Sequence, residues 1–238
     1  MKLLITTQAV DINDPVLGFF VRWIEEFAKH CEQIEVICLR SGEYSLPKNV
    51  RVHTLHSWNK IGRAFELVGL SNTLSYDSVF VHMNPEYIVV AGWVWKMRGK
   101  KIVLWYMHKA VNMRLRIAEF FANDIVTASK ESFRLKTKKL HILGHGIDTD
   151  IFYPNPSIPR GEWALSLGRL TKSKRHDLAI DIAHADGKKL TIVGNGPERE
   201  ALELYAKKLG ATVEFFRRGS ACPTWGYISQ SCVLYPHQ

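Results

Sequence analysis

Residues 78–107 read SVFVHMNPEYIVVAGWVWKMRGKKIVLWYM, and this stretch decides the fold class. Two short apolar runs within it, residues 78–82 and 101–107, are rich in β-branched and aromatic residues and are typical of strands. A longer helical pattern over residues 85–97 separates them. Strand–helix–strand order of this kind favours a parallel sheet with helices on its faces, because the chain must cross over between two parallel strands.

The same alternation extends in both directions along the chain. Further strands are predicted at residues 2–7, 34–39, 50–54, 124–128 and 140–143. Further helices are predicted at residues 16–30, 113–122 and 130–136. In the first of these helices Phe20, Trp23, Ile24 and Phe27 fall on one side, which is the spacing of a buried helical face. The chain is therefore expected to have an α/β fold.

A proline-rich segment interrupts the alternation. Residues 153–159 read YPNPSIP, a composition typical of an extended linker. The pattern then restarts, with strands predicted at residues 163–167, 189–193, 212–216 and 232–235 and helices at residues 176–184 and 198–209. We therefore predict an N-terminal domain over residues 1–154 and a second domain over residues 155–238. The second domain has fewer strands and no closing helix, so we expect it to be incomplete.

The composition is that of a globular protein. Of the 238 residues, 46% are hydrophobic and 23% are charged, and no apolar run reaches the roughly 18 residues that a membrane span needs. The apolar run at the N-terminus is too short for a signal peptide, so a cytoplasmic location is expected. The four cysteines form no C-x-x-C pair, and the ten histidines are scattered. We predict buried free thiols, no bound metal and no cofactor.

The net charge of +9 is unevenly distributed. No acidic residue lies between Glu86 and Glu119, and a second basic cluster follows. The basic residues of the two clusters are Lys96, Arg98, Lys100, Lys101, Lys109, Arg114, Arg116, Lys130, Arg134, Lys136, Lys138 and Lys139. Such a surface attracts phosphate groups of a nucleotide, an anionic lipid or a nucleic acid, and an ordinary solvated basic face is the alternative. No helix-turn-helix, finger or RNA-binding signature is present, so nucleic acid is not an expected partner.

The loop after the strand predicted at residues 163–167 carries the first chemical signal. Gly168 ends the strand, and Arg169 and Lys174 follow before the next helix. Ligands of open α/β sheets bind at the carboxyl ends of strands. Arginine offers a planar fork and lysine a point charge, and together they suit the oxygens of a diphosphate. A basic surface loop without a ligand is the alternative interpretation.

A glycine turn gives the second signal. Residues 192–198 read IVGNGPE, with Gly194 and Gly196 in the turn and a proline and a glutamate that open a helix. Proline suits the first helical position, glutamate suits the positive end of the helix dipole, and the free amides of such a turn can hold an anion. The pattern lacks the third glycine of the dinucleotide fingerprint, so a purely structural turn is the alternative.

A third segment makes a family resemblance specific. Residues 144–154 read GHGIDTDIFYP, and the Gly168 loop and the Gly194 turn follow it in order. DPVLGFF stands at residues 14–20, and VHMNP and WYMHK follow later strands. In these motifs and their spacing the sequence resembles glycosyltransferase family 4 along nearly its whole length. The resemblance implies two facing Rossmann-like domains of the GT-B type, both with parallel sheets, and sugar transfer with retention of anomeric configuration.

The resemblance also implies roles for single residues at the donor site. Arg169 and Lys174 stand where the family's cations hold the donor diphosphate, and they would neutralise the charge that grows on the leaving nucleotide. Gly194 and Gly196 stand where the family's loop lies beside the nucleotide. Gly18 stands where a loop of the first domain approaches the donor phosphate or the acceptor.

Two histidines of the first domain complete the implied site. His108 stands where family members place a histidine near the transferred sugar, and it is our candidate catalytic residue; a polar residue that caps a strand end is the alternative. His82 is the candidate acceptor-side residue, with a structural role equally open. The resemblance implies that protein cations do the work of a catalytic metal.

The implied activity is transfer of a sugar from a nucleotide-diphosphate donor to a hydroxyl, on a lipid-linked sugar or a growing surface polysaccharide. The basic first domain, with Trp93, Trp95, Trp105 and Tyr106 among its cations, would suit peripheral docking at the inner face of an anionic membrane.

Family members continue into a segment with two glutamates that grip the donor, so this chain alone is expected to be inactive or weakly active. A sugar-nucleotide epimerase of the same architecture and a non-catalytic nucleotide-binding fragment remain alternatives. Residues 216–226 fit the family poorly.

Overall fold

A computed structural model describes residues 1–147, 149 and 163–217 of the chain. The chain divides into two compact units, Met1–His145 and Gly146–Gln238. Each unit has its own sheet and its own apolar core. The domain boundary predicted near residue 155 and the strand predicted at residues 232–235 lie outside the described residues.

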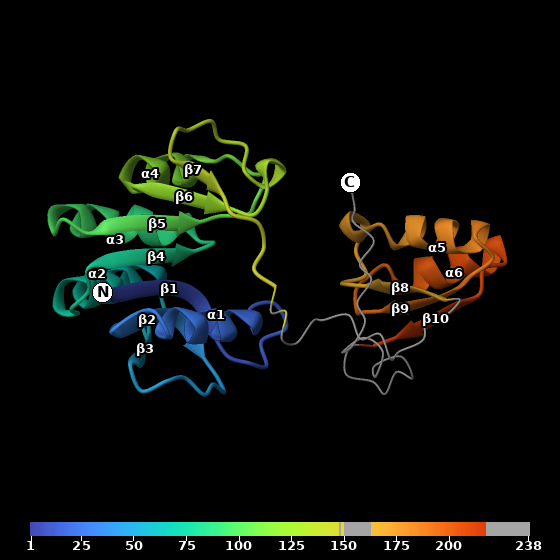
Figure 1. Ribbon diagram of the computed structural model, residues 1–238, viewed down its shortest axis with the longest axis horizontal. Helices are drawn as coiled ribbons and strands as arrows, with labels where there is room; N and C mark the ends of the chain where they lie inside the picture. The colour runs from blue at the N-terminus through green and yellow to red at the C-terminus, as the bar shows by residue number, and fades with distance from the viewer. Residues whose placement is uncertain (148, 150–162, 218–238) are drawn as a thin grey trace. The chain divides into compact units, whose positions relative to one another are not determined.

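The first unit is built on a seven-stranded sheet in which neighbouring strands are parallel (Figure 1). Its strands are β1 (Lys2–Val10), β2 (Gln33–Ser41), β3 (Val50–Thr54), β4 (Ser78–His82), β5 (Lys101–Trp105), β6 (Asp124–Thr127) and β7 (Leu140–Ile142). Their order is β3-β2-β1-β4-β5-β6-β7. The order reverses between β1 and β4, and it is at such a switch point that open α/β sheets bind ligands.

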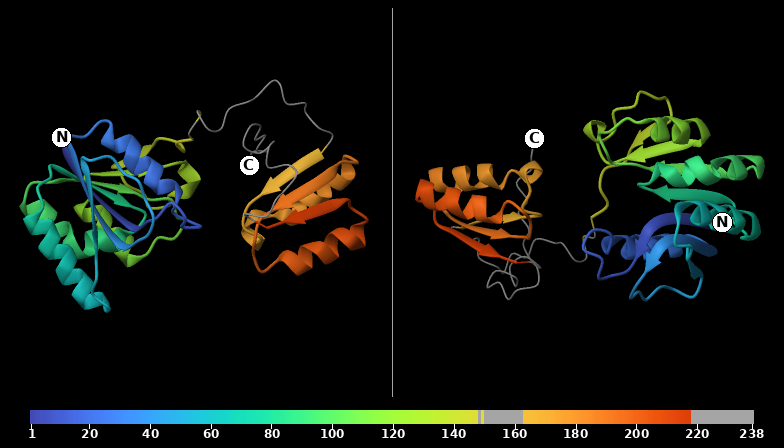
Figure 2. Two further views of the ribbon diagram at one scale, coloured as in Figure 1. Left: turned by 90° about the horizontal axis from the view of Figure 1, so that it is seen from below. Right: turned by 180° about the vertical axis from the view of Figure 1, so that it is seen from behind.

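Helices cover both faces of this sheet (Figures 1 and 2). The helices are α1 (Phe19–Ala28), α2 (Lys60–Thr73), α3 (Pro85–Met97) and α4 (Met113–Phe121). Successive residues of a strand point to opposite faces, so Ile5 packs with Phe20 of α1, whereas Leu4 packs with Trp95 of α3. α2 and α4 lie on the same face as α3. The predicted α/β fold is therefore confirmed.

The second unit contains a three-stranded parallel sheet within the described residues, in the order β10-β9-β8. Its elements are β8 (Trp163–Leu167), the short 3-10 helix η2 (Lys172–Lys174), α5 (His176–Ala185), β9 (Lys189–Val193), α6 (Arg199–Leu209) and β10 (Val213–Phe216). Leu190 and Ile192 of β9 pack with Ile180 of α5 and Leu202 of α6. This unit thus repeats the strand–helix–strand arrangement of the first.

The helix α2 is absent from the predicted helices. Its apolar residues do not follow one face, since Leu67 is buried while Ile61 and Phe65 point to solvent. Gly62 and Gly69 also lower the helical propensity of the segment. An amphipathic pattern is the main signal for a helix, and this segment does not provide one.

The helix predicted at residues 130–136 is wrong. Only the 3-10 helix η1 (Lys130–Ser132) forms there. Phe133 is buried in the core shared with α3 and α4, and Leu135 packs against the same core. Side chains two residues apart share a face in extended backbone but not in a helix, so the burial of both residues overrides the helical pattern.

Candidate functional site

The predicted site residues of the first unit all lie at the carboxyl edge of its sheet. Gly18 precedes α1, in the loop that follows β1. His82 is the last residue of β4, and it pairs in register with Trp105, the last residue of β5. His108 lies in the loop after β5. Because β1 and β4 are neighbours, the topology brings Gly18 and His82 to the switch point of the sheet.

The loop between β1 and α1 is organised by Asp14. One carboxylate oxygen accepts hydrogen bonds from the amides of Val16 and Leu17, at 2.8 and 2.7 Å. The other lies 2.6 Å from Nη2 of Arg40. The hydrogen bond from Arg40, followed by those from the two amides, lowers the pKa of the Asp14 carboxyl to about 2. The carboxylate is therefore charged at neutral pH and fixes the loop.

Gly18 is required by close backbone packing in this loop. A Cβ atom at this position would lie 2.6 Å from the carbonyl oxygen of Ile12 and 2.8 Å from that of Asp14. Beside the glycine, Ile12, Val16 and Phe19 are 59%, 58% and 52% exposed. The edge of the sheet near Gly18 therefore presents an apolar surface to solvent.

His82 is buried at the switch point. Its ring stacks on that of Phe20, with centroids 3.8 Å apart and planes 9° from parallel, and its Nδ1 lies 3.1 Å from the Thr7 hydroxyl. Only 2% of the residue is exposed, and burial lowers its pKa to about 4. The ring is therefore neutral at neutral pH, and an acceptor would reach it only after the aromatic residues of α1 moved. Its acceptor-side role stays a prediction.

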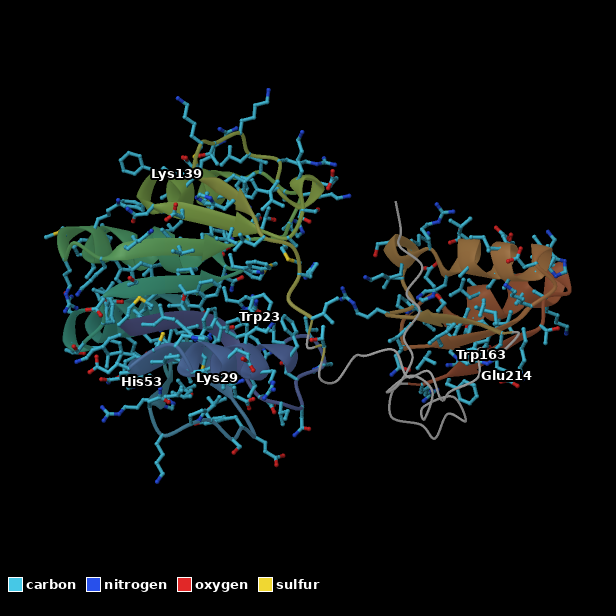
Figure 3. All side chains as sticks on the ribbon, in the orientation of Figure 1. Trp23, Lys29, His53, Lys139, Trp163 and Glu214 are labelled. Carbon is cyan, nitrogen blue, oxygen red and sulfur yellow. The ribbon has the colours of Figure 1, made fainter. Side chains whose placement is uncertain are left out.

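The residue after His82 adopts a backbone conformation that is rare for a residue with a side chain. Met83 has a φ of 64°, and across it the amide of Asn84 donates to the carbonyl of His82 at 2.8 Å. Met83 packs in an aromatic cluster with Trp105 and Trp23. Figure 3 labels Trp23 of this cluster. A three-residue turn with positive φ is strained, and such strain is found preferentially at functional sites. It supports the switch point as a binding region.

His108 is exposed at the same edge. Its Nδ1 accepts a hydrogen bond from the amide of Ala110 at 3.0 Å, so the neutral ring carries its proton on Nε2. Within the described residues Nε2 has no hydrogen-bond partner, and no hydrogen bond joins His108 to His82. An exposed N–H donor of this kind suits a hydroxyl of a bound ligand.

In the second unit, the loop after β8 presents two cations to solvent. Gly168 has a φ of 157°, a conformation that side chains rarely allow. Arg169 and Lys174 are both exposed, and neither forms an ion pair with a carboxylate within the described part of the chain. Arg175, by contrast, pairs with Asp177 at 3.0 Å. The charges of Arg169 and Lys174 are therefore available to an anion.

The turn after β9 packs backbone to backbone against this loop. The amide of Leu170 donates to the carbonyl of Asn195 at 2.9 Å. A Cβ atom at Gly196 would overlap the carbonyl group of Leu170, and one at Gly194 would overlap the carbonyl oxygen of Gly168. The two glycines therefore let the turn and the cationic loop touch. The structure brings together the two cations and the two glycines that the sequence assigns to the donor site.

Two backbone amides of this turn remain open. The amide of Gly194 donates to the carbonyl of Phe216 at 3.0 Å, whereas those of Asn195 and Gly196 have no backbone acceptor among the residues that the structure describes. Both residues are exposed. α6 starts directly after its N-cap Glu198, so the positive end of its dipole lies next to the turn. Open amides beside two unpaired cations form an arrangement that suits a phosphate or a diphosphate.

Two buried residues that hold the cationic loop are missing from the sequence-based site. Leu170 is fully buried and anchors the loop in the core. Nε2 of His176 donates to the carbonyl of Arg169 at 3.2 Å, and its Nδ1 lies 2.8 Å from the Ser166 hydroxyl. Because a carbonyl only accepts, Nε2 carries the proton and Nδ1 of the neutral ring accepts from the serine. The one sequence signal for the role of His176 is its position at the start of a predicted helix, and that position does not indicate that the side chain is buried.

The basic residues between positions 96 and 139 do not form one surface. α3 and α4 each run from the carboxyl edge to the amino edge of the sheet, so the stretch alternates between the two edges. Several of its cations also bind groups of the protein. Arg98 donates to the carbonyl of Ser71, Lys100 donates to the carbonyl of Tyr76, and Lys101, Arg114 and Lys139 pair with Asp124, Glu86 and Glu119.

The aromatic residues expected at the surface of this stretch are mostly internal. Trp95, Trp105 and Tyr106 are buried, and Trp93 is 47% exposed. Parallel strands and the helices that cover them place large apolar residues in the core, so the expected surface position of the three buried residues is wrong. Among the described residues, none of the helices is both long and apolar enough to cross a bilayer.

The described cysteines are free, and no metal cluster accompanies them. Cys31 and Cys38 are buried, and burial raises the pKa of both thiols. Cys222 and Cys232 lie outside the described residues. In the described part of the chain, no group of three or more histidine, cysteine, aspartate or glutamate residues is arranged to hold a metal ion.

The two Rossmann-like units with parallel sheets place the chain in the GT-B class of folds. The chain is similar to a lipopolysaccharide outer core galactosyltransferase, WaaB in its apo form, with a TM-score of 0.64 and 18% identity over 97% of this chain and 71% of that one. It is also similar to a glycosyltransferase from Rickettsia africae ESF-5, with a TM-score of 0.63 and 13% identity over 96% of this chain and 71% of that one.

An enzyme of another kind shares the architecture. A UDP-N-acetylglucosamine 2-epimerase matches with a TM-score of 0.52 and 10% identity over 91% of this chain and 68% of that one. No protein-family model and no curated protein sequence matches the chain. At these identities the similarity establishes the fold.

Proposed function

We propose that the protein is a glycosyltransferase that moves a sugar from a nucleoside diphosphate to a hydroxyl, with retention, as in family 4. The observation that carries the proposal is the anion-binding arrangement at the carboxyl edge of the second sheet. There Arg169 and Lys174, which have no carboxylate partner in the described part of the chain, lie on a loop that packs against the turn carrying the Asn195 and Gly196 amides, for which the same part provides no backbone acceptor. The GT-B fold that the chain shares with two glycosyltransferases supports the same assignment.

The cations of this arrangement suit the chemistry of sugar transfer. When the bond between the anomeric carbon and the diphosphate oxygen breaks, negative charge grows on the departing diphosphate. Arg169 and Lys174 would bind that group more tightly as its charge grows, and such differential binding lowers the barrier. In the first unit, Nε2 of His108 would donate a hydrogen bond to a hydroxyl of the transferred sugar and orient it.

The proposed acceptor is a sugar hydroxyl, carried on a lipid-linked sugar or a surface polysaccharide. Support for a lipid-linked acceptor comes from the apolar surface beside Gly18, where Ile12, Val16 and Phe19 are more than half exposed. Apolar side chains in water near a binding edge are typical of a site for an apolar ligand or partner.

Mutation of the two cations tests the donor site. Arg169→Ala and Lys174→Ala should each weaken the binding of UDP or GDP by about 2 kcal/mol, roughly thirtyfold, because each removes a charge-assisted contact. Isothermal titration calorimetry on the full chain measures this. Lys208→Ala, which removes an exposed cation from the last turn of α6, is the matched control and should leave affinity unchanged. Equal affinity in all three variants and the wild type would overturn the assignment.

A sugar-nucleotide epimerase is the second candidate, because the chain shares its fold with one. An epimerase would hold the same diphosphate but would need no acceptor. Chromatography of the products separates the two functions. A transferase releases free nucleoside diphosphate that depends on an added acceptor, whereas an epimerase converts the donor into an isomer without one.

A further inference from the structure

A pocket of about 350 Å³ lies in the second unit where α5 and α6 pack against each other (Figure 1). Its size falls in the range of roughly 300–1,000 Å³ that is typical of small-molecule sites. The segment before α5 and the first turn of α5 form one part of its lining, and the N-terminal half of α6 forms the other. Arg169, Lys174, Asn195 and Gly196 do not line it, so we treat it as separate from the candidate donor site and call it the α5–α6 pocket.

One wall of the α5–α6 pocket is apolar. Ala201 and Leu202 form it together with the ring of Tyr205, which lies one turn further along α6. Leu202 is buried, whereas Tyr205 is 37% exposed. The Tyr205 hydroxyl donates a 2.6 Å hydrogen bond to the Asp181 carboxylate on α5. Because this bond ties the ring to the neighbouring helix, the ring offers a fixed apolar surface to a ligand.

Charged groups of both signs complete the lining. Lys172 is exposed and forms no ion pair within the described residues. Nε of Arg175 lies 3.0 and 3.1 Å from the two carboxylate oxygens of Asp177, and the terminal nitrogens of its guanidinium have no partner in the same part of the chain. The Glu198 carboxylate is half-buried, and the described residues provide it with neither a hydrogen bond nor an ion pair. The pocket therefore offers both cationic donors and an anionic acceptor to a ligand.

The backbone at Arg175 is strained. This residue precedes α5 with a φ of 49° and a ψ of 44°, in the left-handed region that residues with a side chain rarely adopt. Such strain is found preferentially at functional sites. It supports the interpretation of the α5–α6 pocket as a binding site.

We propose that the α5–α6 pocket binds a free amino acid with a large apolar side chain. A ligand with a single charge would satisfy Lys172 and Arg175 or Glu198, but not both. A zwitterion satisfies both, because its carboxylate accepts from the two cations and its ammonium group donates to the glutamate. Its side chain would cover the apolar wall and stack on the ring of Tyr205. This binding does not depend on sugar transfer, so either proposal can fail alone.

Isothermal titration calorimetry of the full chain with L-phenylalanine tests the proposal. No nucleotide is present, so the result does not depend on the proposed transfer activity. Phenylalanine should bind. Two analogues, 3-phenylpropionate without the ammonium group and 2-phenylethylamine without the carboxylate, should each bind about tenfold more weakly, because each loses a charge-assisted contact.

Substitutions in the lining place the ligand in the α5–α6 pocket. Glu198→Gln removes the charge and keeps the shape, and Arg175→Asn removes the guanidinium while asparagine tolerates the left-handed backbone. Each should weaken phenylalanine binding about tenfold. Glu200→Gln is the matched control, because Glu200 also lies in the first turn of α6 but does not line the pocket. It should bind phenylalanine as the wild type does, and circular dichroism should show the wild-type fold in all three variants.

Three results would each overturn the proposal. The first is that the wild type does not bind phenylalanine. The second is that 3-phenylpropionate binds as tightly as phenylalanine, since the cations would then act without Glu198. The third is that Glu198→Gln and Glu200→Gln bind phenylalanine equally well, since the ligand would then lie elsewhere.

Discussion

At the scale of single residues, Gly18 gives a direct test of the loop before α1. Gly18→Ala should lower the free energy of unfolding by about 1–3 kcal/mol, because the added methyl group must displace the carbonyls of Ile12 and Asp14. Urea denaturation measures this. Gly69→Ala is the control, since an added Cβ there meets nothing within 4 Å and an alanine in α2 should add roughly 0.5–1 kcal/mol. Equal effects of the two substitutions would contradict the close packing at Gly18.

His82 predicts a pH dependence of stability. Its pKa is lowered to about 4 by burial, whereas the unfolded chain has the ordinary value near 6.5. As the pH falls below about 6.5 the unfolded state takes up the proton first, so the stabilising contribution is present above that pH and is lost as the pH falls towards 4. The loss should amount to about 3 kcal/mol when complete.

Denaturant titration at a series of pH values measures this contribution. His82→Gln keeps a polar side chain beside Thr7 but does not titrate, so its stability should change less with pH over the same range. An identical pH profile in His82→Gln and the wild type would show that the buried histidine does not control the acid response.

At the scale of elements, the contact between the turn after β9 and the loop after β8 predicts which substitutions in the turn disturb the candidate donor site. Gly196→Ala should lower the free energy of unfolding by about 1–3 kcal/mol and weaken UDP binding, because its Cβ overlaps the carbonyl group of Leu170 and must push the two segments apart. Asn195→Ala changes an exposed side chain and keeps the open amide, so it should bind UDP nearly as the wild type does. Calorimetry that showed the reverse order would place the anion on the asparagine side chain.

Most elements could be predicted from the sequence because their patterns are local. The bounds of β3, β4, β8, β9 and α3 are those predicted. Short apolar runs between polar turns mark the four strands, and a helical pattern that opens at Pro85 marks α3. α2 could not be predicted in the same way, because its exposed residues Ile61 and Phe65 blur the amphipathic signal. The prediction of a helix at residues 130–136 was wrong although the local pattern was helical, because the burial of Phe133 in the tertiary structure overrides that pattern.

At the scale of the whole molecule, the residue types of the candidate donor site could be predicted from the sequence, but the buried contacts that hold its loop in place could not. The sequence identifies Arg169 and Lys174 as cations, and Gly194 and Gly196 as turn formers, because they follow predicted strands. The support from Leu170 depends on its contact with Asn195, which is distant in the sequence, and the support from His176 depends on its burial, and no local pattern encodes either of them. The same reason explains why a contiguous basic stretch divides between two edges of the sheet once the helices cross it.

The backbone contact between the loop after β8 and the turn after β9 also determines which positions of these two segments tolerate substitution and which do not. Its contacts run through main-chain atoms of Leu170 and Asn195 and through the absence of side chains at Gly194 and Gly196. The exposed side chains of Arg169 and Asn195 take no part in it. A combinatorial library that randomises exposed positions of the loop and turn while it keeps both glycines and the leucine would therefore retain its scaffold, and selection on it would report ligand preference and not folding.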